Sequence, residues 1–208
     1  MPEYKLYYFH GRGTAEVARL LFASSETKYE DIRFNMDEEW SKFKAETPYG
    51  QLPILSIDGK MINQSGAIYR YLAREFGMYG DNNLENSMVD VVIETFFDIA
   101  AVMGKLYHAT GDEKEELRRN VRETVLPKFK TFLETMIKTN GGSYLVGSKI
   151  SLADIVVFDI LDKASDGNRF SVETNVDNLK DYELLKALTE RVKTAPGIKE
   201  YLESRPSL

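Results

Sequence analysis

Hydrophobic residues change their spacing near residue 78 of this 208-residue chain. Before that point, alternating or continuous apolar segments predict strands, and segments with a spacing of three or four predict helices. Asp58 and Gly59 form a two-residue hairpin signal between the last two strands. The predicted strands are 4–9, 31–34, 54–57 and 61–62, and the predicted helices are 16–24 and 65–76. This order predicts a small mixed sheet with helices on its faces.

After a turn-rich break at residues 77–83, the apolar pattern is almost entirely helical. The first long helix of this half carries apolar residues along one face, at Met88, Val92, Phe96, Ile99 and Met103. A second long helix is expected over residues 113–139, where Pro127 should introduce a kink because proline lacks the backbone N–H. Shorter helices are expected over residues 155–161, 182–194 and 197–204, the first of them opened by a capping box at residues 151–154.

The two patterns together predict an α/β plus all-α fold. We expect residues 1–78 to form a thioredoxin-like domain and residues 84–208 to form an all-helical domain. A hydrophobic content of 43% is enough for a sizeable core in a chain of this length.

Composition narrows the classes of function. The chain has no cysteine, which excludes disulfides and thiol catalysis, and its histidines lie far apart at positions 10 and 108, so no metal site is expected. The net charge of −6 disfavours nucleic acid as a partner. The apolar runs are too short for a membrane span, and residues 1–5 lack the features of a signal peptide, so we expect a cytoplasmic protein.

Candidate chemistry is concentrated at the end of the first strand. Tyr7 and Tyr8 lie there, and the segment Gly11–Thr14 begins a helix directly afterwards. A helix N-terminus has unpaired N–H groups and roughly half a positive charge, so a phenol beside it can act on an anion held there. The local sequence leaves an alternative in which one tyrosine packs in the core and the other covers the surface, because strands favour aromatic residues.

Several separate segments resemble the glutathione S-transferase family, and in particular its sigma class, including the invertebrate branch. They are YKLYYFHGRGTAEVARLLF, TPYGQLPIL, the dipeptide DG and QSGAIYRYLA in the first half, and GGSYLVGSKISLADIVVFD in the second. They occur in the family's order and with its spacing over nearly the whole chain. The resemblance implies a first domain that binds glutathione and a helical domain that contributes the site of the second, hydrophobic substrate.

The resemblance implies that Tyr8 is the catalytic residue, whose hydroxyl donates a hydrogen bond to the glutathione sulfur and favours the thiolate. A free thiol has a pKa near ~8.5, so only a small fraction is ionised at neutral pH. A phenol stays protonated at pH 7 and can donate this bond. The nucleophile then belongs to glutathione as cosubstrate, and no tightly bound cofactor is expected.

By the same resemblance, the other glutathione-binding residues are Trp40, Lys44, Gln51, Leu52, Pro53, Gln64, Ser65 and Asp98. Leu52 would pair its backbone with the cysteinyl part, beside a Pro53 that is cis in the family. Gln64 and Ser65 would cradle the γ-glutamyl carboxylate where a strand meets a helix. Asp98 would reach the α-amino group across the interface of a homodimer.

The other end of glutathione, the glycyl carboxylate, is assigned by the resemblance to Trp40 and Lys44, with Gln51 lining the same end. Ordinary structural roles remain open at several of these positions. Lys44 can be an exposed lysine on a polar helix, Asp98 can be an exposed carboxylate, and Ser65 can cap its helix.

The walls of the second-substrate site are expected from Phe9, Gly13, Thr14, Met103, Tyr107, Val156, Ile160 and Leu208, although core packing explains the helical ones equally well. Sigma-class members that make prostaglandin D have an arginine, an aspartate and a tryptophan where this chain has Thr14, Phe97 and Lys105. The resemblance therefore favours a general conjugating enzyme or a carrier of hydrophobic ligands over a prostaglandin isomerase.

The expected function is that of a homodimeric glutathione transferase that conjugates small, electrophilic, apolar compounds, and glutathione-dependent peroxide reduction is left open as a second activity. The alternatives are a carrier of haem or other hydrophobic ligands, a crystallin-like structural protein, and a prostaglandin D isomerase. The absence of cysteine excludes a redox enzyme of the thioredoxin type.

Overall fold

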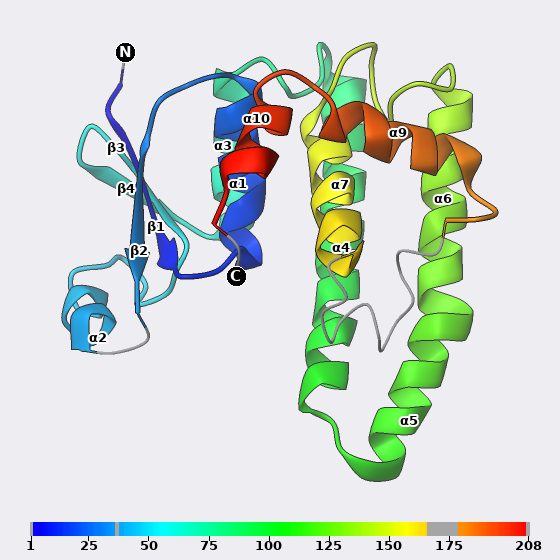
Figure 1. Ribbon diagram of the computed structural model, residues 1–208, viewed down its shortest axis with the longest axis horizontal. Helices are drawn as coiled ribbons and strands as arrows, with labels where there is room; N and C mark the ends of the chain where they lie inside the picture. Colours follow the sequence, from blue (N-terminus) through cyan, green and yellow to red (C-terminus); the bar gives the residue numbers. More distant parts are fainter. Residues whose placement is uncertain (1, 36–37, 166–178, 207–208) are drawn as a thin grey trace. The chain divides into compact units, whose positions relative to one another are not determined.

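A computed structural model describes residues 2–35, 38–165 and 179–206 (Figure 1). The chain divides into two compact units. The first combines Met1–Gly77 with the C-terminal segment Ala195–Leu208, and the second is Met78–Thr194. No helix of the described residues combines the length and the hydrophobicity needed to cross a membrane.

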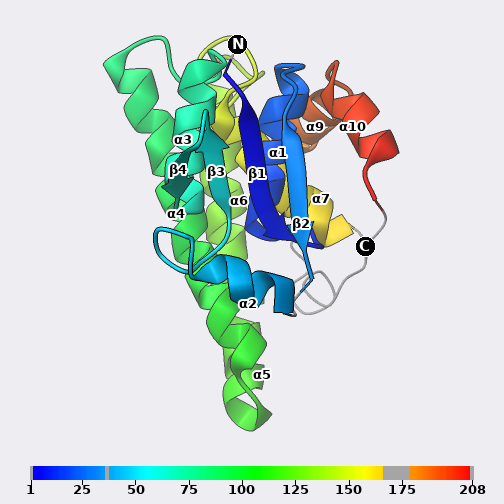
Figure 2. The same cartoon turned by 90° about the vertical axis from the view of Figure 1, so that its left-hand side faces the viewer.

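The first unit is built on a four-stranded sheet with the order β2-β1-β3-β4 (Figure 2). Its strands are β1 (Tyr4–Phe9), β2 (Glu30–Phe34), β3 (Ile54–Ile57) and β4 (Lys60–Asn63). β1 and β2 are parallel, whereas β1 pairs with β3 and β3 with β4 in antiparallel register. A parallel pair needs a crossover connection, and here the connection contains helix α1 (Glu16–Ser24).

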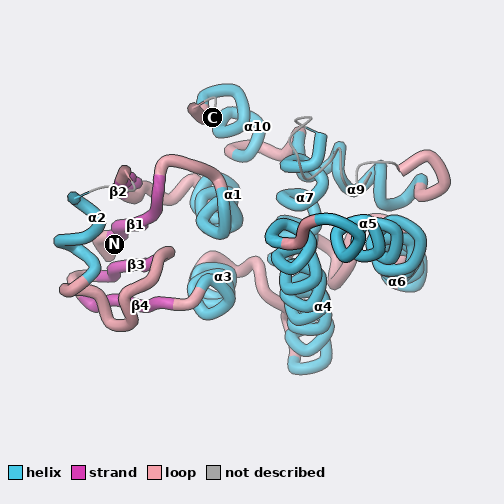
Figure 3. The backbone as a smooth tube through the Cα atoms, turned by 90° about the horizontal axis from the view of Figure 1, so that it is seen from below, coloured by secondary structure: helices cyan, strands magenta, loops and turns pink. Residues whose placement is uncertain are grey.

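Helices cover both faces of this sheet. α1 and α3 (Ser65–Glu75) lie on one face and α2 (Glu38–Lys44) on the other (Figure 3). α10 (Ile198–Ser204) packs against α1 although nearly the whole sequence separates them. A Cβ atom at Gly197, where α10 begins, would lie 2.1 Å from the carbonyl oxygen of Ala23, so only glycine permits this contact. The predicted thioredoxin-like arrangement is confirmed.

Several local predictions in this unit are also confirmed. The strand over residues 4–9 and the helix over residues 16–24 have the predicted bounds. Asp58 and Gly59 join β3 to β4 with φ angles of 48° and 84°, and two positive φ angles are what a type I′ hairpin turn requires.

The described residues of the second unit form helices joined by loops, with no strand among them. α4 (Asn83–His108) and α6 (Leu126–Thr139) are its long helices, α7 (Leu152–Ser165) packs against α4, and α9 (Glu183–Lys193) packs against α6 and α7. The buried residues of α4 are Val89, Val92, Ile93, Ile99 and Leu106. Of the five residues predicted to share its buried face, Met88, Phe96 and Met103 are only half-buried.

The helix predicted over residues 113–139 is interrupted. α5 (Gly111–Asn120) ends in a π-helical turn, η2 (Val121–Val125), in which the N–H of Leu126 bonds to the carbonyl of Val121, and α6 follows. Pro127 is the physical reason, because it lacks an N–H and its ring occupies the space beside the carbonyl four residues earlier. An extra residue in the preceding turn relieves both conflicts.

The capping box opens α7. The Asp154 carboxylate accepts hydrogen bonds from the N–H and the Oγ of Ser151, both at 2.7 Å, and from the N–H of Leu145 at 2.9 Å. The side chain of Asp154 is fully buried, so these bonds replace the water that its oxygen atoms lose. The capping box therefore joins the start of α7 to the loop that precedes it.

Candidate active site

Three chain segments meet at one end of the sheet. Tyr7 of β1 lies opposite Ile54, so the start of β3 is beside the end of β1. Ile54 also lies opposite Asn63, which brings the end of β4 to the same place. The register therefore gathers several of the predicted site residues at this end of the sheet, namely Tyr8, Phe9, Leu52, Pro53, Gln64 and Ser65.

The alternation of β1 separates its two tyrosines. The ring of Tyr7 stacks on Phe43 of α2, with centroids 4.9 Å apart, and on Phe34 at 6.3 Å. Tyr8 points to the opposite face, where its hydroxyl reaches Thr14 just before α1. The packing alternative thus describes Tyr7, and Tyr8 is the phenol beside the helix N-terminus.

The Tyr8 oxygen accepts two hydrogen bonds from Thr14, one from the N–H at 3.2 Å and one from Oγ1 at 3.3 Å. Thr14 lies in a short 3-10 turn, η1 (Gly13–Ala15), that runs into α1. The hydroxyl of Tyr69, on α3, donates to the carbonyl of Thr14 and holds this turn from the other side. Because the bonds from Thr14 use only lone pairs, Tyr8 keeps its own O–H to donate to another group.

Gly13 allows this close approach. A Cβ atom at this position would lie 2.2 Å from the Tyr8 hydroxyl and 2.6 Å from a carbon of its ring. The φ angle of Gly13 is +41°, in a region that residues with a side chain rarely adopt. Contact and backbone conformation therefore both require glycine here.

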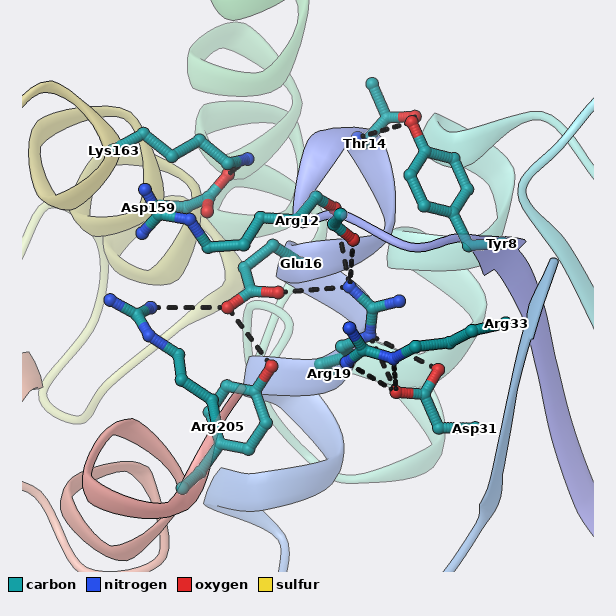
Figure 4. A network of polar contacts seen from close by, with 12 residues as sticks. Tyr8, Arg12, Thr14, Glu16, Arg19, Asp31, Arg33, Asp159, Lys163 and Arg205 are labelled. Atoms are coloured by element: carbon teal, nitrogen blue, oxygen red, sulfur yellow. Dashed lines mark hydrogen bonds and ion pairs between the residues drawn. The ribbon is translucent and has the colours of Figure 1, made fainter. Parts of the chain in front are cut away.

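A buried guanidinium stabilises the loop between β1 and α1 (Figure 4). Arg19 of α1 has no exposed surface. Its Nη1 donates to the carbonyl of Gly11 at 2.9 Å, to the carbonyl of Arg12 at 3.5 Å and to a carboxylate oxygen of Glu16 at 3.2 Å. Its Nε bonds to Asp31 of β2 at 3.1 Å.

Each carboxylate of this cluster has a second basic partner. Glu16, which is 1% exposed, also accepts hydrogen bonds from Arg205 at 3.3 Å and from Tyr201 at 3.1 Å. Burial raises the pKa of the Tyr201 phenol, and the negative charge of Glu16 raises it further. Asp31 pairs with Arg33 at 2.8 Å. Three guanidinium groups therefore face two carboxylates, which leaves one positive charge in excess.

The start of α3 has the features expected of an anion-binding segment. Gln64 is exposed and has φ 70° and ψ 113°, an unusual conformation for a residue with a side chain. It directly precedes Ser65, where the first N–H groups of the helix have no partner inside it. The peptide bond between Leu52 and Pro53 is cis, as the resemblance implied.

The residues predicted for the glycyl end lie around α2. The ring of Trp40 meets that of Phe9 edge to face, with centroids 5.5 Å apart, which links α2 to the end of β1. Lys44 is exposed, and its Cε lies 3.3 Å from the position of a Cβ at Gly50, so its chain runs beside the loop that leads to Gln51. Trp40, Lys44 and Gln51 thus lie near the same end of the sheet.

The predicted site residues of the helical unit differ in their exposure. Asp98 and Tyr107 of α4 are exposed, the latter by 62%, and Met103 is half-buried. Val156 of α7 is fully buried and Ile160 is 7% exposed. A fully buried side chain can touch a ligand only if the groups that cover it move. Leu208 lies outside the described residues.

Sequence reasoning missed two parts of the site: the role of Arg19, and the hydrogen bonds from Thr14 to Tyr8. A signal for the first was present, since Glu16 and Arg19 are the only charged residues in the otherwise apolar helix over residues 16–24. In the described part of the chain, no three His, Cys, Asp or Glu side chains are grouped to share a metal ion.

Two family profiles match the chain. The profile described as glutathione S-transferase, N-terminal domain, matches residues 4–74, and the profile described as glutathione S-transferase, C-terminal domain, matches residues 97–205. Among curated proteins, glutathione S-transferase 1 of Ascaris suum is 36% identical over 99% of this chain and 98% of its own length. S-crystallin SL11 of Nototodarus sloanii has the same identity and coverage.

Solved structures are similar over the full length. A Nu-class glutathione S-transferase from Haemonchus contortus is 36% identical with a TM-score of 0.86, covering 100% of this chain and 99% of its own. The structure of a prostaglandin synthase D of Nilaparvata lugens is 35% identical, also with a TM-score of 0.86, and all of both chains is covered.

Proposed function

The chain belongs to the glutathione S-transferase family and is an enzyme of that family; we propose that it joins the thiolate of glutathione to small, electrophilic, apolar compounds. The observation that carries this proposal is the position of the Tyr8 hydroxyl. It lies at the N-terminus of a helix, accepts two hydrogen bonds from Thr14, and keeps its proton to donate.

Tyr8 donates its O–H to the sulfur of bound glutathione and so stabilises the thiolate relative to the thiol. Each unit by which the thiol pKa falls is worth about 1.4 kcal/mol. The N–H of Thr14 and the positive end of the helix act in the same direction, because they place positive charge beside a developing anion. The thiolate then attacks the electrophile, a carbon–sulfur bond forms, and a leaving group departs or a double bond is saturated.

In our proposal, the rest of glutathione binds at the same end of the sheet. Gln64 and Ser65 receive the γ-glutamyl carboxylate at the start of α3, where helix N–H groups favour an anion. The backbone of Leu52 pairs with the cysteinyl part, and Trp40 with Lys44 holds the glycyl carboxylate. The gathering of these segments by the strand register supports the assignment.

Replacing Tyr8 with phenylalanine tests the proposal. Tyr8→Phe should fold and bind glutathione but lose turnover with an aryl halide by about 10²–10³-fold, the usual cost of one preorganised donor to a developing anion. Tyr7→Phe is the matched control, because Tyr7 packs between aromatic rings and should keep full turnover. Equal turnover in the two variants, or an essential Tyr7, would refute the assignment of Tyr8.

The finer classification is also a proposal. We place the enzyme in the sigma class and in the cytoplasm, with glutathione-dependent peroxide reduction as a second activity. Residues 1–78 would serve as the glutathione-binding domain, and residues 84–208 would supply walls of the electrophile site. A panel of aryl halides and lipid peroxides, assayed with glutathione, would determine which reaction dominates.

We further propose that two copies form a symmetric dimer through the helical unit. A hollow of about 500 Å³ lies between α4 and the η2–α6 segment, and Asp98 lines it together with largely apolar side chains. Val91 in this hollow is 41% exposed, and an apolar surface of this kind is typical of one that a partner covers.

The dimer proposal predicts a selective effect at Asp98. If Asp98 reaches the glutathione bound to the partner copy, Asp98→Ala should raise the KM for glutathione more than it lowers kcat, the pattern of lost ground-state binding. Sedimentation at micromolar concentration gives the oligomeric state of the same samples. A fully active monomer would remove the basis for this role.

A further inference from the structure

We propose that Arg19 is a positioning residue for Tyr8: it holds the loop that donates to the Tyr8 hydroxyl, and it places a buried positive charge over the Tyr8 ring. The inference rests on the proposed function, in which Tyr8 donates to the sulfur of glutathione. Arg19 has no exposed surface, so it cannot touch glutathione and must act through the residues around it.

The first part of this role is mechanical. Nη1 of Arg19 binds the carbonyls of Gly11 and Arg12, at 2.9 and 3.5 Å. The next two residues are Gly13, which touches the Tyr8 hydroxyl, and Thr14, which donates to it. Loss of the guanidinium would release these carbonyls, and with them the turn that carries the Thr14 donors.

The second part is electrostatic. Cζ of Arg19 lies 5.9 Å from the centroid of the Tyr8 ring, within the range of a cation–π interaction. Nη2 of Arg19 is buried and has no hydrogen-bond partner among the described residues, and it points to the side on which Tyr8 lies (Figure 4). Buried N–H groups are nearly always paired, so this one calls for an explanation. A cation over the ring gains attraction as the phenol donates to a thiolate and its electron density rises.

The neighbouring charges do not cancel the positive charge of Arg19 at the Tyr8 ring. The charged and titratable groups around Arg19 include Glu16 on α1, Tyr29 and Asp31 with Arg33 at β2, and Tyr201 with Arg205 at α10. The two carboxylates of this set each bind a second guanidinium, so they do not neutralise Arg19 fully. Both phenols have a raised pKa because they are buried, and they stay neutral at physiological pH.

The test measures the thiol pKa of bound glutathione, from the ultraviolet absorbance of the thiolate as a function of pH in saturated complexes. Arg19→Gln should raise this pKa by about one unit and lower kcat/KM roughly tenfold at pH values below the wild-type thiol pKa, because one pKa unit is a tenfold change in thiolate in that range. The Kd for glutathione should stay within about twofold of the wild type, since Arg19 does not reach the ligand.

Arg205→Gln is the matched control. It removes the same charge from the same cluster, but on the far side of Glu16 from Tyr8 and without a bond to the loop, so it should raise the thiol pKa by clearly less than Arg19→Gln does (Figure 4). A pKa shift in Arg205→Gln as large as that in Arg19→Gln would overturn the proposal, because any lost charge in the cluster would then suffice.

Arg19→Lys still tests the inference if Arg19→Gln does not fold. Lysine retains the charge but cannot bridge two carbonyls and two carboxylates at once, so the thiol pKa should rise by less than in Arg19→Gln but measurably. A folded variant of either kind with the wild-type thiol pKa overturns the inference. Tyr8→Phe, titrated in parallel, separates the two proposals. If its thiol pKa equals that of the wild type, the role of Tyr8 is refuted. If only the Arg19 variants have the wild-type thiol pKa, the role of Arg19 alone is refuted.

Discussion

At the level of single residues, the absence of a side chain at Gly13 is as important for the site as the phenol of Tyr8, which lies against it. Tyr8 is enclosed by Gly13 on one side and by the two donors of Thr14 on another. Side chains pack at near-crystalline density, so one added methyl group must displace a neighbour. The nearest neighbour here is the hydroxyl on which the proposed chemistry depends.

Gly13→Ala should therefore reduce turnover, because the new methyl group would lie 2.2 Å from the Tyr8 oxygen and would push the ring away from Thr14. We expect a loss in kcat of at least tenfold, approaching that of Tyr8→Phe. Gly59→Ala is the control for backbone strain, since Gly59 has φ +84° but open space around its Cβ position. It should lose stability, by roughly 1–2 kcal/mol for a strained left-handed residue, and retain turnover. A fully active Gly13→Ala enzyme would contradict this account.

The same residues show how much of the site the sequence could predict. Tyr8 and the neighbouring segments could be predicted as site residues because their order resembles a family whose chemistry is known. The contacts of Arg19 were not predicted, because they join it to Gly11 and Asp31, which lie at other positions in the chain. Helical periodicity places an arginine on a helix face, but it does not show that every side of that helix is buried.

At the level of secondary structure, Asp154 gives the helical unit a pH-dependent stability. Burial raises the pKa of its carboxyl group to about 6 from an ordinary value of 3.8, although hydrogen bonds from Leu145 and Ser151 oppose the rise. Between these values the unfolded chain releases a proton that the folded chain keeps. The contribution to the free energy of unfolding is thus fully present below pH 3.8 and is lost as the pH rises through 6.

Asp154→Ala removes this titration along with the cap. The difference in unfolding free energy between wild type and Asp154→Ala should be larger at pH 5 than at pH 7.5, by roughly 1.4 kcal/mol for the one pKa unit that remains. Urea unfolding at the two pH values measures it. Ser151→Ala is the control, because it loses a hydrogen bond but leaves the carboxyl group to titrate. A difference that instead grows towards pH 7.5 would mean that the hydrogen bonds outweigh burial.

The secondary structure itself was predicted where local chemistry determines it. The turn at Asp58 and Gly59 and the start of α7 follow from the residues at those positions. The break between α5 and α6 was predicted only as a kink at Pro127, because a proline disturbs the turn before it without specifying how the backbone adapts. The packing of α10 on α1 depends on a contact between Gly197 and Ala23, which no local pattern encodes.

At the level of the whole molecule, similarity does not separate the activities of the relatives. A glutathione S-transferase, an S-crystallin and a prostaglandin synthase D are 35–36% identical to this chain over essentially its full length. The two compared structures have the same TM-score of 0.86. Fold and overall identity are shared, so the choice of reaction depends on individual side chains at the site.

The positions that distinguish prostaglandin D synthesis lead to the last prediction. By resemblance, Thr14, Phe97 and Lys105 replace an arginine, an aspartate and a tryptophan. Without the arginine, the site loses one guanidinium that could bind a carboxylate or peroxide oxygen, and the hydroxyl of Thr14 already donates to Tyr8. Without the aspartate, an acidic metal site loses an oxygen ligand that hard cations need, although Glu94, one turn before Asp98, offers another carboxylate.

We therefore expect conjugation of an aryl halide or reduction of a lipid peroxide to be faster than isomerisation of prostaglandin H, and addition of Mg²⁺ or Ca²⁺ to leave all three rates unchanged. The measurement is prostaglandin D formation with and without Mg²⁺, beside the conjugation rate of the same enzyme sample. Thr14→Arg is the informative variant, because it restores the guanidinium and removes the hydroxyl that donates to Tyr8, so isomerisation should gain relative to conjugation. Rapid, metal-stimulated prostaglandin D formation by the unmodified enzyme would mean that the substrate preference is set by residues other than these three.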